Sequence, residues 1–231
     1  MKGYFGIEFY EIETPLRSRK LQGGGVHGNM ILSRFKPKEI KRIDLPTYFD
    51  WENLTRLSKY TKKIEPRLGN RTALICTWEI ANVTLIVCSA HLEDKAGGIA
   101  ARQSQFEHII KSVSEIKEED ILIVAGDFNT YENGLSRLVL RRSRGPILNM
   151  TSPGECTIWQ KSFLPSFNLK ANFPCNQWTF RVARLFKVKL DWIISSSNCR
   201  ITARGVEDFN TSDHRPLWIE IEIPKISSGS A

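Results

Sequence analysis

The chain has 231 residues, a hydrophobic content of 41% and a formal net charge of +8, which indicate a basic protein with enough apolar residues for one full-sized core. No uninterrupted apolar stretch is long enough to span a membrane, and the first residues lack the charged-then-apolar pattern of a secretory signal. The five cysteines form no Cys-x-x-Cys pair, so no zinc site is expected and a reducing, cytoplasmic setting is favoured.

Hydrophobic periodicity predicts strands and helices along most of the chain. Strands are expected at residues 4–10, 29–34, 40–45, 72–80, 84–89, 121–125, 190–195, 200–204 and 217–223. A long helix is expected at 99–116, a shorter one at 132–142, loop across most of 145–180 and a frayed tail at 225–231. This order predicts a mixed α/β (α+β) layered fold, with one domain spanning residues 1–224.

Positive charge is concentrated in one part of the chain. Residues 136–205 contain 12 Lys and Arg against 2 Asp and Glu, whereas residues 76–135 contain 4 against 10. A basic segment attracts polyanions, and aromatic residues among its charges, such as Trp178 and Phe180, can stack on nucleic-acid bases. The same pattern is typical of a solvated face with core aromatics, or of a lipid-headgroup contact. We expect polyanion binding through three arginines: Arg141, Arg142 and Arg181.

Two polar side chains follow the apolar run 121–125, after Gly126. The carboxyl end of a strand in an open α/β sheet is where ligands bind. Asp127 can bind a hard cation or activate water, and Asn129 can orient an oxyanion. A strand followed by an ordinary Asp-Asn turn explains this segment equally well.

Polar groups also accompany three other predicted strands. Asp213 and His214 precede the strand at 217–223, His91 follows the strand at 84–89, and Asp191 lies in a third. Asp beside His is a pairing that hydrolytic sites use to bind a metal and to move protons. One histidine at a strand end is most often structural, but four coincident cases indicate a site.

Taken in chain order, these segments resemble the endonuclease/exonuclease/phosphatase superfamily of deoxyribonuclease-like phosphoesterases. The resemblance runs from about Gly3 to about Ile223 and implies two packed β-sheets, mainly antiparallel or mixed, flanked by helices, with the active site at one edge. The matching pieces are Gly28–Arg34, His91–Glu93, Arg102 with Gln105, Gly126–Asn129, Leu190–Ile193 and Ser212–Pro216.

The resemblance implies metal-dependent hydrolysis of a phosphoester, with Mg²⁺ or Mn²⁺ as the cofactor and a nucleic-acid phosphodiester as the favoured substrate. Lipid headgroups and inositol phosphates stay open as alternatives. His214 is then the base or phosphate donor, and Asp191 fixes its tautomer. His91 is the acid or phosphate donor on the other side, Asp127 orients or deprotonates the water, and Asn129 holds a phosphoryl oxygen. The expected metal ligands are Asp127 and Asp213.

One part of the family's pattern has no counterpart here. The family begins with a strand-helix-strand unit that ends in Gln-Glu, and this Glu is the main metal carboxylate. Glu8 and Glu11 do not follow a Gln at the end of an apolar run, so neither is assigned that role. We therefore expect a chain that lacks this N-terminal portion. The alternative hypothesis is a catalytically impaired fragment or relative that binds phosphate-rich partners without turnover.

Overall fold

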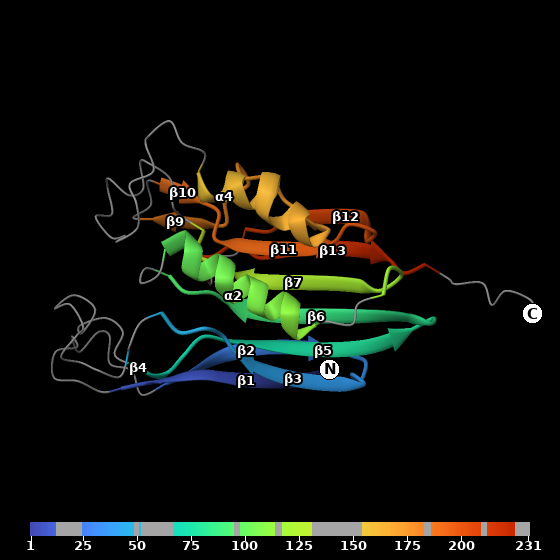
Figure 1. Ribbon diagram of the computed structural model, residues 1–231, viewed down its shortest axis with the longest axis horizontal. Helices are drawn as coiled ribbons and strands as arrows, with labels where there is room; N and C mark the ends of the chain where they lie inside the picture. The colour runs from blue at the N-terminus through green and yellow to red at the C-terminus, as the bar shows by residue number, and fades with distance from the viewer. Residues whose placement is uncertain are drawn as a thin grey trace, which may run out of the picture.

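The computed structural model describes residues 1–12, 25–48, 51, 67–94, 98–113, 117–130, 154–182, 186–208 and 212–224. In these ranges a six-stranded sheet forms the middle layer, with helices on one face and two smaller sheets on the other (Figure 1). The predicted fold class, a sandwich of mixed sheets flanked by helices, is confirmed. The predicted helix at 132–142 and the tail at 225–231 lie outside the described residues.

The central sheet contains the three strands whose ends carry predicted site residues, β6 (Val83–His91), β7 (Ile121–Asp127) and β11 (Asp191–Ser196). Its strands, in spatial order, are β3 (Glu39–Asp44), β5 (Thr72–Ile80), β6, β7, β11 and β8 (Leu169–Ala171). Only β6 and β7 are parallel among these pairs, and helix α2 (Gly98–Ser112) lies between them in the chain. Their carboxyl ends therefore meet at one edge of the sheet.

The largest core lies between this sheet and the helices. Phe106 and Ile109 of α2 are fully buried against the sheet, as is Trp159, which belongs to a second helical segment. That segment consists of α4 (Glu155–Ile158), the π-helical η2 (Trp159–Phe163) and the 3₁₀ turn η3 (Leu164–Phe167). The prediction of loop was wrong here. Pro165 lies at the start of η3, where its missing N–H costs no helical hydrogen bond.

Two small sheets cover parts of the other face. The first contains β2 (Val26–Ser33), β1 (Lys2–Glu11) and β4 (Arg67–Gly69), and the second contains β12 (Arg200–Val206) and β13 (Leu217–Glu222). Ile31 packs against Leu74 and Trp78 beneath the first sheet, whereas Ile201 and Ile221 pack near Val83 beneath the second. A short hairpin consists of β9 (Phe180–Val182) and β10 (Phe186–Val188). It lies near the point where β11 begins (Figure 1).

The outer face of the β1–β2 pair carries large apolar side chains in contact with solvent. Phe5 lies opposite Met30, and the two are 49% and 53% exposed. Ile7 and Leu32 are exposed on the same face. An apolar surface of this kind is a site of association or aggregation in soluble proteins.

The cysteines divide into two groups. Cys76, Cys88 and Cys199 are free and buried, so the prediction that Cys76 and Cys88 are core thiols is confirmed. Cys156 and Cys175 instead form a disulfide that joins α4 to the segment leading into β9. The cysteine pattern, which favoured a reducing setting, did not predict this bond, because the two residues are 19 positions apart with no motif between them.

Candidate active site

Three of the predicted site residues lie side by side across three adjacent strands. His91 at the end of β6 is in register with Asp127 at the end of β7, and Asp127 is in register with Asp191 at the start of β11. The close approach of β6 and β7 depends on Gly126, whose φ is +146°. A Cβ at this position would lie 1.9 Å from the carbonyl oxygen of Ala90, so only glycine fits.

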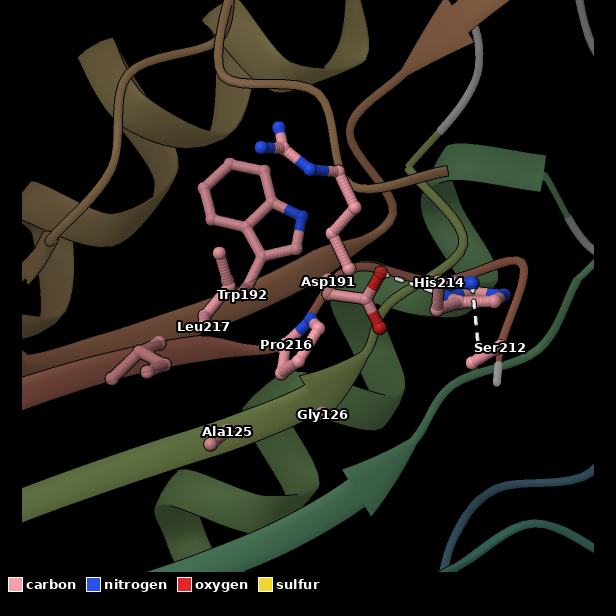
Figure 2. Close-up of a pocket in the computed structure, with 10 residues that line it drawn as sticks. Ala125, Gly126, Asp191, Trp192, Ser212, His214, Pro216 and Leu217 are labelled. Carbon is pink, nitrogen blue, oxygen red and sulfur yellow. Dashed lines mark hydrogen bonds and ion pairs between the residues drawn. The ribbon is translucent and has the colours of Figure 1, made fainter. Parts of the chain in front are cut away.

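The fourth predicted residue, His214, reaches this row through Asp191. His214 Nδ1 lies 2.8 Å from Asp191 Oδ2, as the dashed line in Figure 2 shows. The Thr179 hydroxyl accepts hydrogen bonds from the backbone N–H groups of Leu190 and Asp191, both at 3.0 Å, and so fixes the start of β11. The hydrogen bond to Asp191 raises the pKa of His214 above its ordinary value, although partial burial acts in the opposite direction.

His91 is held by a buried ion pair that the sequence did not predict. Arg71 Nη1 lies 2.7 Å from His91 Nδ1 and 2.7 Å from Glu8 Oε1. Glu8 and Arg71 are both almost fully buried. Burial favours the neutral form of Glu8, but the nearby His91, whose Nδ1 is 3.6 Å from Glu8 Oε2, and the charge of Arg71 outweigh it and lower the pKa of the carboxyl. Glu8 thus lies in the site, although it does not follow a Gln and was not predicted to be a site residue.

The hydrogen bonds of His91 define its neutral tautomer. A guanidinium can only donate, so the 2.7 Å contact with Arg71 requires Nδ1 of neutral His91 to accept. The ring hydrogen is then on Nε2, which lies 3.8 Å from Asp127 Oδ2. The opposite holds for neutral His214, because the Asp191 carboxylate can only accept and so requires the hydrogen on Nδ1. Neutral His91 can therefore donate a hydrogen bond from Nε2, whereas neutral His214 has a lone pair on Nε2.

Asp127 and Asn129 form one local unit after β7. The backbone N–H of Asn129 donates to Asp127 Oδ1 at 2.9 Å, and Asn129 Nδ2 donates to the carbonyl oxygen of Leu92 at 3.0 Å. Asn129 has a positive φ of 50°, which asparagine tolerates better than most residues. Burial raises the pKa of Asp127; the nearby Asp191 also raises it, whereas His91 and His214 lower it. The Asp-Asn turn is thus present, and it holds Asp127 between the two histidines.

The remaining motif residues support the strand ends. Arg102 is fully buried and makes two 2.7 Å contacts with the carboxylate of Glu155. It also donates to the carbonyl oxygens of Glu93 and Asp94, which follow β6. Gln105 accepts a hydrogen bond from the backbone N–H of Glu93. These contacts fix the segment after His91 to helix α2. Arg102 and Gln105 therefore have a structural role next to the site.

An open cleft of about 370 Å³ lies beside the Asp191–His214 pair. Figure 2 shows the Asp191 carboxylate pointing toward the imidazole of His214, and Trp192 extending from the next position of β11. The cleft is lined by Ala125, Gly126, Asp191, Trp192, Ile193, Ser212, His214, Arg215, Pro216 and Leu217. A concave surface next to a histidine–carboxylate pair is a default candidate for substrate binding.

The other predicted site residues have different environments. Asp213 lies in the exposed turn before β13, next to His214. Arg181 is exposed on β9. Arg141 and Arg142 lie outside the described residues.

The donor chemistry at the strand ends suits a hard divalent cation. Asp127 offers a carboxylate beside that of Asp191, and magnesium is often bound through one or two carboxylates together with substrate phosphate and water. Within the described ranges, however, no group of three or more His, Cys, Asp or Glu side chains is placed to hold a metal. The residues present fit an open site of this kind, and they do not form a closed protein cage.

The sequence contains one signal that points to Glu8. This residue interrupts the apolar strand Tyr4–Tyr10 between Ile7 and Phe9, and a carboxylate at such a position needs a buried partner. The partner itself was not predictable, because Arg71 lies 63 residues further along the chain. Lys189 is a second buried charge near the site. Its Nζ donates to the carbonyl oxygen of Phe173, and burial lowers its pKa to about 7.

Known structures share this architecture. An endonuclease/exonuclease/phosphatase from Beutenbergia cavernae DSM 12333 aligns with a TM-score of 0.61 at 15% identity, over 95% of this chain and 53% of its own. A family protein from Leptotrichia buccalis C-1013-b aligns with a TM-score of 0.56 at 14% identity, over 96% and 71%. D. rerio TDP2, complexed with a single-strand DNA product, aligns with a TM-score of 0.51 at 16% identity, over 94% and 77%.

The chain therefore spans about half the length of the Beutenbergia cavernae protein. No curated protein matches its sequence. Within the described ranges, no helix has both the length and the apolar character needed to cross a membrane. The model of the endonuclease/exonuclease/phosphatase family matches residues 4–214, nearly the whole chain. The chain belongs to the endonuclease/exonuclease/phosphatase family.

Proposed function

We propose that the protein hydrolyses phosphodiester bonds in nucleic acid with the help of a divalent cation. The observation that carries this proposal is the arrangement of two histidines around Asp127. One histidine is oriented by Asp191, and the other is oriented by Arg71 beside Glu8. Hydrolysis of a phosphoester requires an activated water, stabilised phosphoryl oxygens and a protonated leaving oxygen.

His214 is the proposed base. Its hydrogen bond to Asp191 keeps the ring hydrogen on Nδ1 and leaves the Nε2 lone pair free to accept a proton. The carboxylate also stabilises the imidazolium that forms when the proton is taken up. Asp191 acts as a positioning residue, because its effect on the reaction is exerted through His214.

His91 is the proposed acid. The Arg71 contact leaves the ring hydrogen on Nε2, so the neutral ring donates toward the side of the site where Asp127 lies. In this position the neutral ring can donate a hydrogen bond to a phosphoryl oxygen. The protonated ring, whose Nδ1 lies 3.6 Å from Glu8 Oε2, can give its Nε2 proton to the leaving oxygen and return to the neutral form. Glu8 and Arg71 are positioning residues for His91, as Asp191 is for His214.

Asp127 lies between the two histidines, and its proposed role is to orient or deprotonate the attacking water. The second hydrogen of Asn129 Nδ2, the one not donated to Leu92, is free to hold a phosphoryl oxygen. The cation, Mg²⁺ or Mn²⁺, would be held by Asp127, with Asp213 as the second proposed ligand. When bound, it supplies positive charge that stabilises the phosphoryl oxygens.

Nucleic acid is the proposed substrate class, for two reasons. The chain has a net charge of +8, and the exposed Arg181 belongs to its most basic segment. In addition, the similar fold of D. rerio TDP2 holds a single-strand DNA product. Lipid and inositol phosphoesters are the competing substrates within the same reaction class.

A second candidate function is phosphate binding without turnover. The observation in its favour is that no described group of three His, Cys, Asp or Glu side chains is placed to hold a metal. Loss of a metal ligand costs a metalloenzyme a large part of its activity. The two candidates differ in a single measurable quantity, which is the rate of phosphoester cleavage.

A substrate panel tests the proposal. The protein is incubated with Mg²⁺ or Mn²⁺ and, separately, with single-stranded DNA, a dinucleotide, sphingomyelin or an inositol phosphate. We expect cleavage of DNA and of the dinucleotide, and we expect exhaustive chelation to abolish it. Turnover that survives chelation would show that the metal mechanism is wrong. Binding of DNA without cleavage would favour the second candidate.

The cytoplasmic setting is a separate proposal. It is supported by three buried free thiols, whereas the Cys156–Cys175 disulfide opposes it, because disulfides persist mainly in oxidising compartments. Counting the thiols of protein taken directly from its native compartment decides between the two. Five reactive thiols after unfolding support the cytoplasmic setting, and three contradict it.

A further inference from the structure

Three cations surround one tryptophan ring beside the candidate active site. The guanidinium carbon of Arg215 lies 4.1 Å from the ring centroid of Trp178. The guanidinium carbon of Arg181 lies 4.8 Å from this centroid, and Lys187 Nζ lies 5.0 Å from it. Each pair of cations is therefore within about 10 Å, comparable to the screening length in 0.1 M salt. The charges repel one another across this distance.

The repulsion is only partly neutralised within the protein. Arg215 is bonded to Asp208 at 2.6 Å, but the Asp208 side chain is 78% exposed, which weakens the pair. Among the described carboxylates, none forms an ion pair with Arg181 or Lys187. These two residues also lie directly opposite each other in the β9–β10 hairpin. Like charges at such positions destabilise a hairpin, so this arrangement gains stability from a bound anion.

The cluster is connected to His214 by short contacts. Arg215 follows His214 in the chain, and its backbone N–H donates to the carbonyl oxygen of Thr179 at 2.7 Å. Phe180 forms an isolated β-bridge with His214, and their ring centroids are 4.7 Å apart. An anion held by the cluster would thus lie next to the cleft beside the Asp191–His214 pair.

We propose that Arg181, Lys187 and Arg215, arranged around Trp178, form a second phosphate subsite that holds a neighbouring phosphate of a single-stranded polynucleotide. This inference rests on the proposed function, because it assigns the scissile phosphate to the site around Asp127. A substrate with one phosphate cannot occupy both positions. The cluster therefore selects a chain of phosphodiesters over an isolated phosphoester.

The surroundings of the cluster favour a polynucleotide over a lipid surface. Membrane-binding sites combine cations with exposed apolar side chains that enter the bilayer. Among the described residues, the exposed large apolar side chains belong to residues 1–48, to Leu68 and to Trp218. None of them belongs to the segment of Trp178, and Phe180 and Val188, the apolar side chains that the structure describes in the β9–β10 hairpin, are half-buried. The described part of the cluster's surroundings thus presents charge without an apolar insertion surface.

The test compares the double variant Arg181→Ala/Lys187→Ala with the control Arg34→Ala/Lys36→Ala. Both variants remove one exposed arginine and one exposed lysine. Arg34 and Lys36 precede β3, which runs parallel to β6 because each is antiparallel to β5. They therefore lie at the end of the sheet opposite the strand ends of the candidate site.

Binding of a fluorescently labelled single-stranded DNA oligonucleotide is measured by anisotropy at several salt concentrations, with EDTA present so that no turnover occurs. We expect Kd to rise about tenfold or more in the Arg181→Ala/Lys187→Ala variant, and the salt slope to fall by roughly 0.7, for the loss of one neutralised phosphate. The control should keep the affinity of the wild type. Arg181→Lys/Lys187→Arg should restore most of the affinity, because both charges are kept.

Three results would overturn the proposal: an unchanged Kd in the Arg181→Ala/Lys187→Ala variant, an equal loss in the control, or preferential binding of wild type to vesicles containing phosphoinositides. Because binding is measured without turnover, failure of the subsite is distinguishable from failure of the hydrolase proposal. If the protein does hydrolyse DNA, the variant should lose at least tenfold more kcat/KM on an oligonucleotide than on a diester with one phosphate. Equal losses on the two substrates would also contradict a second phosphate subsite.

Discussion

Asp127 and Asp191 lie directly opposite each other across the antiparallel pair β7–β11, and each carboxylate faces a different histidine. Asp191 Oδ2 is 2.8 Å from His214 Nδ1, whereas Asp127 Oδ2 is 3.8 Å from His91 Nε2. Burial raises the pKa of Asp127. Two carboxylates in neighbouring positions thus have different environments, which is how sites assign different proton-transfer roles to similar groups.

The first prediction concerns the pH dependence of hydrolysis. The hydrogen bond to Asp191 is the largest cause of the raised pKa of His214, so Asp191→Asn should lower that pKa. If neutral His214 is the base, log kcat/KM rises with pH as this residue loses its proton. The acidic limb of the profile should then move to lower pH in the variant, while the maximal rate falls. The control Asp44→Asn removes an exposed carboxylate outside the site. An acidic limb at the same pH in wild type and Asp191→Asn would contradict the role of Asp191.

The second prediction concerns the buried pair that holds His91. The side chains of Glu8 and Arg71 are 1% and 4% exposed, so Glu8→Gln leaves a buried guanidinium without its nearest carboxylate. Removing one partner of such a pair costs about 3–5 kcal/mol. The lower end is expected, because Glu93 lies 3.8 Å from Arg71 Nε. Urea denaturation measures the difference in the free energy of unfolding.

The matched control for Glu8→Gln is Glu79→Gln, which breaks the exposed pair between Lys38 and Glu79. Exposed pairs of this kind contribute at most about 1 kcal/mol. The two variants carry the same chemical change and differ mainly in burial. Equal free-energy losses in both would show that Glu8 is not part of a buried network.

The third prediction concerns the Cys156–Cys175 disulfide. It closes a loop of 19 residues, for which the chain-entropy model gives roughly 3 kcal/mol. A reducing agent should therefore lower the melting temperature of the wild type but not that of Cys156→Ala/Cys175→Ala. The same lowering in both proteins would show that the reducing agent acts elsewhere than on this bond, because the remaining cysteines are already free thiols.

The fourth prediction concerns the outer face of the β1–β2 pair. Phe5 and Met30 are exposed cross-strand neighbours there. Phe5→Thr/Met30→Thr should reduce binding of a hydrophobic dye, because it removes apolar surface from solvent contact, and it should change the melting temperature little. Ile31→Thr, which alters the buried face of the same strand, should instead destabilise the protein. Unchanged dye binding in the double variant would mean that the dye binds elsewhere.

The positions of most of the longer strands along the chain could be predicted from the sequence, because alternation and apolar runs depend on local residues. The predicted strand at 72–80 coincides with β5, and the polar residues at the ends of the predicted strands 84–89 and 121–125 lie together as expected. The short strands β4, β8, β9 and β10 were missed, since each has only three residues. In addition, β4 and β8 form only by pairing with the distant strands β1 and β11. Three-residue runs carry too little periodicity to be recognised.

The parts of the site that escaped prediction depend on long-range contacts. Glu8 meets Arg71 and His91 only because the β1–β2 pair packs across β5 and β6, and no local pattern encodes that meeting. The helical segment at 155–167 was taken for loop because four prolines lie in the window from Pro146 to Pro174. Its stability comes from Trp159, Phe163 and Phe167, which pack around Phe106 of α2. Tertiary packing of this kind overrides local propensity.

The central claim is that the residues at the strand ends carry out phosphodiester hydrolysis. Its most direct test is the rate at which His214→Ala and Asp127→Asn cleave single-stranded DNA with Mg²⁺ present, measured together with their melting temperatures. The account predicts that the wild type cleaves the DNA and that each variant is slower by roughly 100-fold or more, the scale of an acid-base group, with a melting temperature close to that of wild type. Wild-type rates in both variants, or no cleavage by the wild type itself, would contradict it.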